Sequence, residues 1–218
     1  TEAFPKILFE SCASGGGRFD GATLAFAPQA WTSDNTDAVE RLAIQWGSSY
    51  MYPLSSTGAH VSDVPNHQVG RITPLWTRAF VAYFGAFGYE LDPLKLSIED
   101  REAIKWQIVF YKKWRAVFQF GNFYRLKGGL QDNEYAWMTV SADKQKAVVL
   151  RVQILSRPNS RSSRLRLRGL DADQDYQVKV LPSVQLKDDA SIRLNSGSRT
   201  GAELMHAGLI CGGDGWAS

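Results

Sequence analysis

The sequence predicts an α/β fold followed by an all-β fold within a chain of 218 residues. In residues 1–121, short apolar or β-branched runs alternate with helical patterns, which is typical of a parallel sheet or barrel. After Gly128-Gly129 the pattern changes to short strands at intervals of roughly 8–15 residues, as in a β-sandwich. We therefore expect two domains, residues 1–121 and 122–218, with a boundary near 122–130.

The expected strands and helices of the first part follow one another in the order of a βα unit. Thr36 is a candidate cap for the helix after the second strand, and Thr73-Pro74 and Ser97 mark the starts of two more helices. The last of these ends at Gly121, a residue suited to a C-cap. Strands are expected at residues 7–12, up to 34, 49–52 and 87–91.

The second part reads as alternating strands without helices. In Arg164-Leu-Arg-Leu-Arg168 the alternation places arginines on one face and leucines on the other, so a solvated strand face is favoured over an anion site. His206 is expected to be a surface or packing residue. Strands are expected at residues 136–140, 147–155, 164–167, 176–180 and 191–194.

Composition narrows the classes of function. Hydrophobic residues make up 44% of the chain, enough for a large core, while the net charge of +3 does not suggest a nucleic-acid-binding protein. No run of about 18 apolar residues predicts a membrane span. Cys12 and Cys211 stand too far apart for a disulfide scaffold, which favours free thiols and a cytoplasmic location.

The stretch Glu10–Asp20 contains three consecutive glycines directly after a predicted strand. Glycines allow positive φ angles and a close approach of the backbone to a ligand, and strand ends are where α/β barrels bind ligands. The spacing of a phosphate-binding loop is absent. A ligand-binding loop and a flexible turn both remain open for this stretch.

The stretch Trp31–Asp37 is the second candidate for chemistry. A carboxyl group that exchanges protons with substrate needs a partly desolvated site, and Asp34 beside Trp31 has the required residue types. Ser, Asp, Asn and Thr before a helix are, however, more often caps, and Asp37 fits that interpretation. Residue types alone therefore leave two roles open for Asp34, proton exchange with a substrate and capping of the helix.

Four stretches of the sequence resemble signature stretches of glycoside hydrolase family 36 α-galactosidases. They are ESCASGGGRFD at 10–20, WTSDNTDAVERL at 31–42, GAHVSDVPNHQVGR at 58–71 and FGYELD at 87–92. The resemblance implies the C-terminal half of a (β/α)8 barrel, with strands five to eight ending at residues 12, 34, 53 and 91. It also implies an antiparallel β-sandwich for the tail.

The resemblance implies a retaining α-galactosidase that hydrolyses terminal α-D-galactosyl residues of melibiose-type and raffinose-type oligosaccharides, without a cofactor. It implies that Asp34 is the general acid/base and that Cys12, Gly15 and Trp31 line the galactose subsite, so these four residues should surround one cavity. The family's nucleophile lies in a Lys-Trp-Asp context that this sequence lacks, because Trp106 precedes Gln107 and Trp114 precedes Arg115. The complete enzyme is expected to be a homo-oligomer.

Three alternatives remain open beside this interpretation. The chain is alternatively part of an α-N-acetylgalactosaminidase or a transglycosylase, or an inactive sugar-binding or assembly fragment.

His60, Asp63 and His67 are candidate metal ligands by residue type, but their spacing fits no structural zinc pattern and hydrolysis by two carboxylates needs no metal. We therefore expect no metal, and a loop at the mouth of the site.

Overall fold

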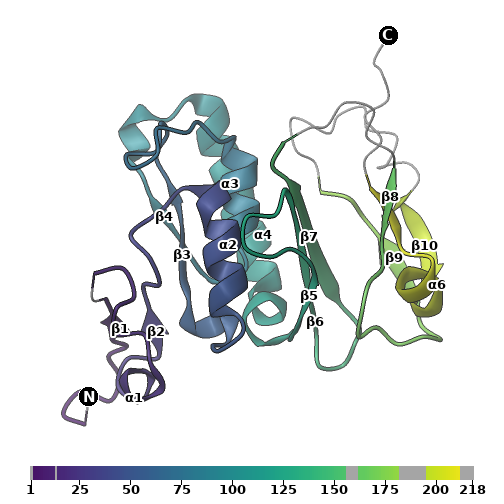
Figure 1. The fold of residues 1–218 in the computed structure, drawn as a ribbon, viewed down its shortest axis with the longest axis horizontal. Coiled ribbons are helices and arrows are strands. Elements are labelled where there is room, and N and C mark those ends of the chain that lie inside the picture. The colour runs from purple at the N-terminus through teal and green to yellow at the C-terminus, as the bar shows by residue number, and fades with distance from the viewer. Residues whose placement is uncertain (1, 13, 156–161, 182–194, 212–218) are drawn as a thin grey trace. The chain divides into compact units, whose positions relative to one another are not determined.

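The protein has a mixed α/β fold, seen here in a computed structural model that describes residues 2–12, 14–155, 162–181 and 195–211 (Figure 1). Residue contacts divide the chain into two compact units. Unit 1 consists of Thr1–Phe120 with Gly129–Gln131, and unit 2 of Gly121–Gly128 with Asp132–Ser218. No described helix is long and apolar enough to cross a membrane.

The strands of unit 1 are parallel and follow one another in chain order. Strand β1 (Glu10–Ser11) pairs with β2 (Gln29–Ala30), and β3 (Gly58–Ser62) pairs with β4 (Ala86–Glu90). A parallel bridge between Ala30 and Thr57 connects the two pairs. The carboxyl ends of all four strands therefore lie at one edge, as the sequence predicts.

Helices separate these strands along the chain, as parallel pairing requires. Helix α2 (Ala38–Ser48) connects β2 to β3, and α3 (Leu75–Ala82) connects β3 to β4 and packs on both. The long helix α4 (Ile98–Phe120) follows β4. Shorter turns complete the unit: α1 (Gly21–Leu24), η1 (Leu54–Ser56) and η2 (Pro93–Lys95).

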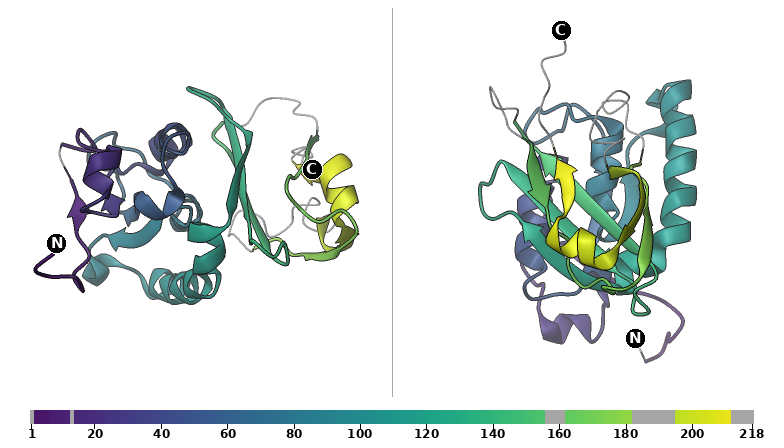
Figure 2. Two further views of the ribbon diagram at one scale, coloured as in Figure 1. Left: turned by 90° about the horizontal axis from the view of Figure 1, so that it is seen from below. Right: turned by 90° about the vertical axis from the view of Figure 1, so that its right-hand side faces the viewer.

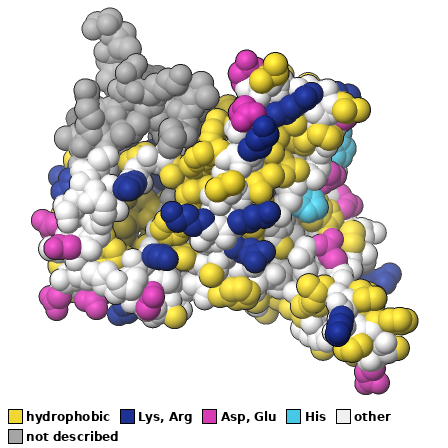
Figure 3. Space-filling model, turned by 180° about the vertical axis from the view of Figure 1, so that it is seen from behind, with side chains coloured by type: hydrophobic (Ala, Val, Ile, Leu, Met, Phe, Trp, Pro, Cys, Tyr) yellow, Lys and Arg dark blue, Asp and Glu magenta, His cyan; other side chains and the backbone are white. Residues whose placement is uncertain are grey.

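An aromatic core joins α3 to α4. The ring of Tyr83 lies 5.8 Å from that of Tyr111 and 5.4 Å from that of Phe118, and the Tyr111 hydroxyl donates to the Gly85 carbonyl at 2.9 Å. The other side of α4 is exposed at Trp106 and Val109. Apolar and basic side chains are interspersed on the face of the protein seen in Figure 3. Core packing is thus the role of the buried face of α4.

The sequence prediction is wrong about the third strand. Ser49 is the C-cap of α2 and the residues up to Tyr52 form the turn that follows it, in which the Tyr52 amide donates to the Ser48 carbonyl at 3.0 Å. The strand is Gly58–Ser62 instead, and it includes His60, which the sequence places in a loop. The likeness to a strand in 49–52 comes from its aromatic and apolar residues, which here follow a helix rather than pair with a neighbour.

Two of the predicted helix caps are also wrong. Asp37, rather than Thr36, caps α2 by accepting from the amides of Val39 and Glu40 at 3.1 and 3.0 Å. Pro74 occupies the cap position of α3, and the Thr73 hydroxyl makes no hydrogen bond among the described residues. Ser97 does accept from the Asp100 amide at 3.0 Å at the start of α4, as predicted.

Every described strand pairing in unit 2 is antiparallel. Strands β5 (Asn122–Lys127), β6 (Glu134–Val140) and β7 (Ala147–Gln153) form one sheet. Two further pairs are formed by β8 (Ser163–Leu165) with β11 (Leu209–Cys211) and by β9 (Asp175–Val178) with β10 (Gly197–Thr200). Figure 2 shows the three-stranded sheet on one side of the unit and α6 (Gly201–His206) on the other.

A hydrophobic core fills the space between these layers. It contains residues from β6, from the 165–176 region and from α6: Ala136, Met138, Val140, Leu165, Leu167, Leu170, Tyr176 and Leu204. Leu165 and Leu167 are buried while Arg164, Arg166 and Arg168 are exposed, which confirms the predicted alternation. Helix α6 contradicts the expectation of a tail without helices, and its residue His206 is exposed. The strand expected at 191–194 lies outside the described residues.

Candidate functional site

The glycine loop after β1 packs directly on the segment that leads to Asp34. Gly15 and Gly16 have positive φ angles of 64° and 94°. A Cβ atom on Gly15 would lie 2.7 Å from the Asp34 amide nitrogen and 3.2 Å from its Cγ, and one on Gly16 would lie 2.5 Å from the Thr32 carbonyl oxygen. Only glycine fits at these two places, because both the backbone angle and the space exclude a side chain.

The ends of this loop are held by ordinary structural contacts. At its start Gln29 donates to the Glu10 carboxylate across the β1–β2 pair. At its end Asp20 caps α1 by accepting from the Thr23 amide at 2.7 Å, and the Phe19 ring stacks on Tyr52 at 3.8 Å. The loop is thus anchored at both ends, so its glycines are placed against Asp34 rather than left as a free linker.

Trp31 follows β2 at the same edge. Its amide donates to the Ser11 carbonyl at 2.9 Å, which brings it beside the residue that precedes Cys12. The Trp31 side chain is buried: its ring lies 4.5 Å from the His60 ring and 4.2 Å from the Arg41 guanidinium carbon. Cys12 is exposed and unpaired in any disulfide. The two residues therefore share the edge formed by the carboxyl ends of β1 and β2.

In the polar run Ser33–Asp37, every side chain except that of Asp34 makes hydrogen bonds that hold the local structure. The Ser33 hydroxyl accepts from the Asn35 amide at 3.1 Å, and the Asn35 side chain accepts from the Asp37 amide at 3.1 Å. The Thr36 hydroxyl accepts from the Asn66 amide group at 3.0 Å, and Asp37 is buried, caps α2 and pairs with Arg71. Among the described residues, the exposed carboxyl group of Asp34 has no hydrogen-bond partner.

Arg41 is a feature of this site that sequence reasoning missed. It is 2% exposed and its guanidinium donates to the Thr32 hydroxyl at 2.9 Å and to the Ser33 carbonyl at 3.0 Å. Burial lowers the pKa of Arg41 to about 10, against the opposing effect of the charges on Glu90 and Asp34. The sequence shows only an arginine within a predicted helix, directly before Leu42.

The three residues considered as metal ligands do not come together. His60 lies on β3, where its Nδ1 is 3.2 Å from a Glu90 carboxylate oxygen of β4. The Asp63 carboxylate instead accepts from the Asp92 amide at 3.4 Å. Within the described ranges no group of three His, Cys, Asp or Glu side chains is arranged to hold a metal ion. His60 is therefore part of the packing around Trp31.

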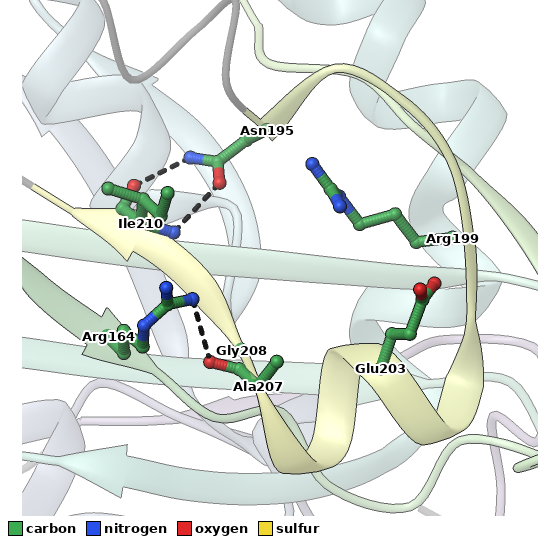
Figure 4. A pocket seen from close by; sticks show the side chains of 7 residues that line it. All are labelled: Arg164, Asn195, Arg199, Glu203, Ala207, Gly208 and Ile210. Atoms are coloured by element: carbon green, nitrogen blue, oxygen red, sulfur yellow. Dashed lines mark hydrogen bonds between the residues drawn. The ribbon is translucent and has the colours of Figure 1, made fainter.

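Unit 2 contains a small cavity of about 90 Å³ whose polar groups are engaged by the fold (Figure 4). Asn195 donates to the Ile210 carbonyl at 2.6 Å and accepts from its amide at 2.8 Å. Arg164 donates to the Ala207 carbonyl, and Glu203 accepts from the Thr200 amide in a capping box. These contacts hold β11 and α6 in place, and we assign the cavity no ligand.

Comparison with known proteins identifies the family of both parts of the chain. The melibiase family model matches residues 1–121, and the model of the glycosyl hydrolase family 36 C-terminal domain matches residues 134–215. Alpha-galactosidase AgaA of Geobacillus stearothermophilus is 51% identical over 209 residues, which are 96% of this chain and 27% of that protein. Alpha-galactosidase Mel36A of Lactobacillus acidophilus is 48% identical over 94% of this chain and 26% of its own length.

Solved structures agree with these sequence matches. A crystal structure of an AgaA variant in complex with raffinose superposes with a TM-score of 0.87 at 48% sequence identity. The superposition covers 98% of this chain and 28% of that one. A structure of the galactosidase domain of the α-galactosidase and sucrose kinase AgaSK gives a TM-score of 0.86 at 42% identity. This chain spans about a quarter of the length of the relatives it matches.

Proposed function

Because this chain belongs to the melibiase family of glycosyl hydrolase family 36, we propose that it supplies the acid/base part of a retaining α-galactosidase. The proposed substrates are oligosaccharides of the melibiose and raffinose type, with a terminal α-D-galactosyl residue. The observation that carries the proposal is the position of Asp34. In a run of polar residues whose other members cap and brace the fold, its carboxyl group alone is exposed and unused, beside the glycine loop.

The proposed architecture explains why the site lies at one edge of unit 1. Four parallel strands in chain order, separated by helices, correspond to strands five to eight of a (β/α)8 barrel, and barrel enzymes place their sites at the carboxyl ends of such strands. The antiparallel layers of unit 2 correspond to a C-terminal β-sandwich. Cys12, Gly15 and Trp31 would line the galactose subsite at the edge that also carries Asp34.

The proposed reaction proceeds in two steps. In the first, a carboxylate outside this chain attacks the anomeric carbon while the protonated Asp34 gives its proton to the departing glycosidic oxygen. In the second, the Asp34 carboxylate takes a proton from water as the water oxygen bonds to the anomeric carbon and the galactosyl ester breaks. Retaining enzymes hold their two carboxyl groups about 5–5.5 Å apart, so Asp34 must face its partner across the bond that is cleaved.

The proposal is tested in a chimera in which the matching 27% of AgaA is replaced by this chain. Asp34→Asn cannot donate a proton or activate water, so we expect the rate of raffinose hydrolysis to fall by roughly 10²–10⁴. An aryl galactoside with a good leaving group needs little acid assistance, so its kcat/KM should fall much less. Steady-state kinetics on the two substrates measure this difference.

Asp37→Asn provides a matched control three residues away. An asparagine still accepts hydrogen bonds as the cap of α2 but loses the ion pair with Arg71, so it affects folding rather than proton transfer. Both substrates should then be hydrolysed with unchanged preference per folded molecule. Hydrolysis of raffinose by Asp34→Asn at the parent rate would reject Asp34 as the acid/base.

A further inference from the structure

Arg41 lies behind the strand end that leads to Asp34 and contacts three consecutive residues of it. Its two terminal nitrogens donate to the Thr32 hydroxyl and the Ser33 carbonyl, and its guanidinium carbon lies 4.2 Å from the centre of the Trp31 ring. The main chain of Arg41 is fixed in α2, where its amide donates to the Asp37 carbonyl at 2.9 Å. A rigid helix thus holds the residues immediately before Asp34.

The glycine loop restrains the same segment. Gly16 approaches the Thr32 carbonyl so closely that a Cβ atom would lie 2.5 Å from its oxygen, and Gly15 lies against the Asp34 amide in the same way. Thr32 is therefore in contact with the loop through its main chain and with Arg41 through its side chain. The position of the Asp34 backbone follows from these two sets of contacts.

Arg41 is a costly residue for packing alone. Its Nε is buried without a hydrogen-bond partner among the described residues, and an unsatisfied buried donor costs about 1–3 kcal/mol. Its pKa of about 10 leaves the guanidinium charged at neutral pH, although no carboxylate forms an ion pair with it in the described residues. A well-packed apolar residue of similar volume often serves stability as well as a buried charge does. We infer from these contacts that Arg41 serves to hold the segment before Asp34 in one position, rather than to stabilise the fold.

We propose that Arg41 is a positioning residue for Asp34, an inference that rests on the proposed role of Asp34 as the acid/base. Through Thr32 and Ser33 it fixes the direction in which the Asp34 carboxyl group points toward the glycosidic oxygen. The charge on Asp34 in turn acts to raise the pKa of Arg41. A displacement of about 1 Å in a catalytic group is enough to reduce a rate by about 10²-fold, so this restraint has a measurable effect.

The test uses the dependence of rate on the leaving group in the chimera of AgaA and this chain. Arg41→Met keeps an apolar stem but makes neither hydrogen bond, so proton donation by Asp34 should weaken. We expect kcat/KM for raffinose to fall by about 10–100-fold, and that for an aryl galactoside with a good leaving group by less than about threefold. Arg41→Lys keeps the charge and one donor group, and should recover part of the loss on raffinose.

Gln45→Met is the matched control for loss of a buried polar side chain on α2. Gln45 is 3% exposed and donates to the Val81 carbonyl at 3.1 Å, away from Thr32 and Ser33. Its replacement should change the two substrates by the same factor. If Arg41→Met does not fold, Thr32→Val is used instead, because it removes one of the two groups that accept a hydrogen bond from Arg41. It should also reduce kcat/KM more for raffinose than for the aryl galactoside, but by a smaller factor than Arg41→Met.

The outcomes separate this inference from the proposed function. An equal loss on both substrates for Arg41→Met, or for Thr32→Val in its place, overturns the positioning role, provided that Asp34→Asn still shows the selective loss on raffinose. Full activity of Arg41→Met on raffinose overturns it as well. An unimpaired Asp34→Asn enzyme instead overturns the proposed function on which the inference rests.

Discussion

At the scale of single residues, the run Ser33–Asp37 shows how residues that cap and brace the fold differ in structure from the proposed acid/base residue, although all of them look alike in sequence. Ser, Asn, Thr and Asp serve equally as turn residues, so residue types alone left two roles for Asp34, and only the family resemblance favoured one of them. The hydrogen bonds separate them: the side chains of Ser33, Asn35, Thr36 and Asp37 each accept at least one from a nearby group. The residue types in this run could not have shown that Asp34 is the one whose side chain has no hydrogen-bond partner among the described residues.

Gly15 gives a prediction at this scale. In Gly15→Ala the new methyl group would meet the Asp34 amide nitrogen at 2.7 Å, at a φ of 64° that costs an L-residue about 1–2 kcal/mol. The loop or Asp34 must move, so we expect kcat/KM of the chimera to fall by about tenfold or more on raffinose. Kinetics and thermal unfolding of the same preparation measure both effects.

Gly21→Ala serves as the control for this substitution. Gly21 begins α1, has no heavy atom within 4 Å of the place that a methyl group would take, and does not require a positive φ. Alanine is favoured over glycine in a helix, so stability and activity should be retained. If Gly15→Ala behaved like Gly21→Ala, the glycine loop would not restrain Asp34.

At the scale of elements, the sequence predicted most strands and helices but misplaced the one that carries His60. Strand β4 was indicated by an apolar run, and α4 by its cap at Ser97 and its end at Gly121. Strand β2 was expected to continue to Asp34 but ends at Ala30. Strand β3 was not indicated, because most of its residues Gly58–Ser62 are small or polar, with Val61 the one β-branched residue, and α3 packs over it. Arg41 was missed for a related reason, since its partners Thr32 and Ser33 come from another element.

The three-stranded sheet of unit 2 gives a prediction about pH. Glu134 at the start of β6 accepts from Lys127 of β5 and from Arg151 of β7 at 2.7 Å. Burial acts to raise the pKa of Glu134, but the hydrogen bonds from Lys127 and Arg151 outweigh it and hold the pKa below its ordinary value. This carboxylate therefore stabilises the folded state above an ordinary pKa of about 4.5, and the contribution is lost as pH falls through the lowered value.

Urea unfolding at a series of pH values tests this contribution. The midpoint of the parent chain should fall more steeply between about pH 5 and pH 3 than that of Glu134→Gln, which has no carboxyl group to protonate. Asp132→Asn, a change at an exposed residue two positions earlier, should follow the parent. Parallel curves for the parent and Glu134→Gln would show that the cross-strand ion pairs do not contribute to acid stability.

At the scale of the whole molecule, the change from parallel to antiparallel pairing near residue 121 was readable in the sequence. Alternating helix and strand patterns gave way to short strands alone, and the described pairings follow that division. Strand β5, which lies at the expected boundary, was not predicted, and neither were α6, β10 and β11. Helix α6 and strand β11 are short, and they contribute Leu204, Leu209 and Cys211 to the core of unit 2. The proposed enzyme combines a nucleophile from outside this chain with Asp34 inside it.

Chemical rescue of Asp34→Asn in the chimera tests most directly whether Asp34 is the acid/base and a separate residue is the nucleophile. Azide attacks a galactosyl ester without a general base, so it should restore turnover of an aryl α-galactoside and release α-galactosyl azide, identified by proton NMR. That product requires a separate nucleophile to have formed the ester first. Release of β-galactosyl azide would mean that azide had replaced Asp34 as the nucleophile and would contradict the account, as would the absence of rescue.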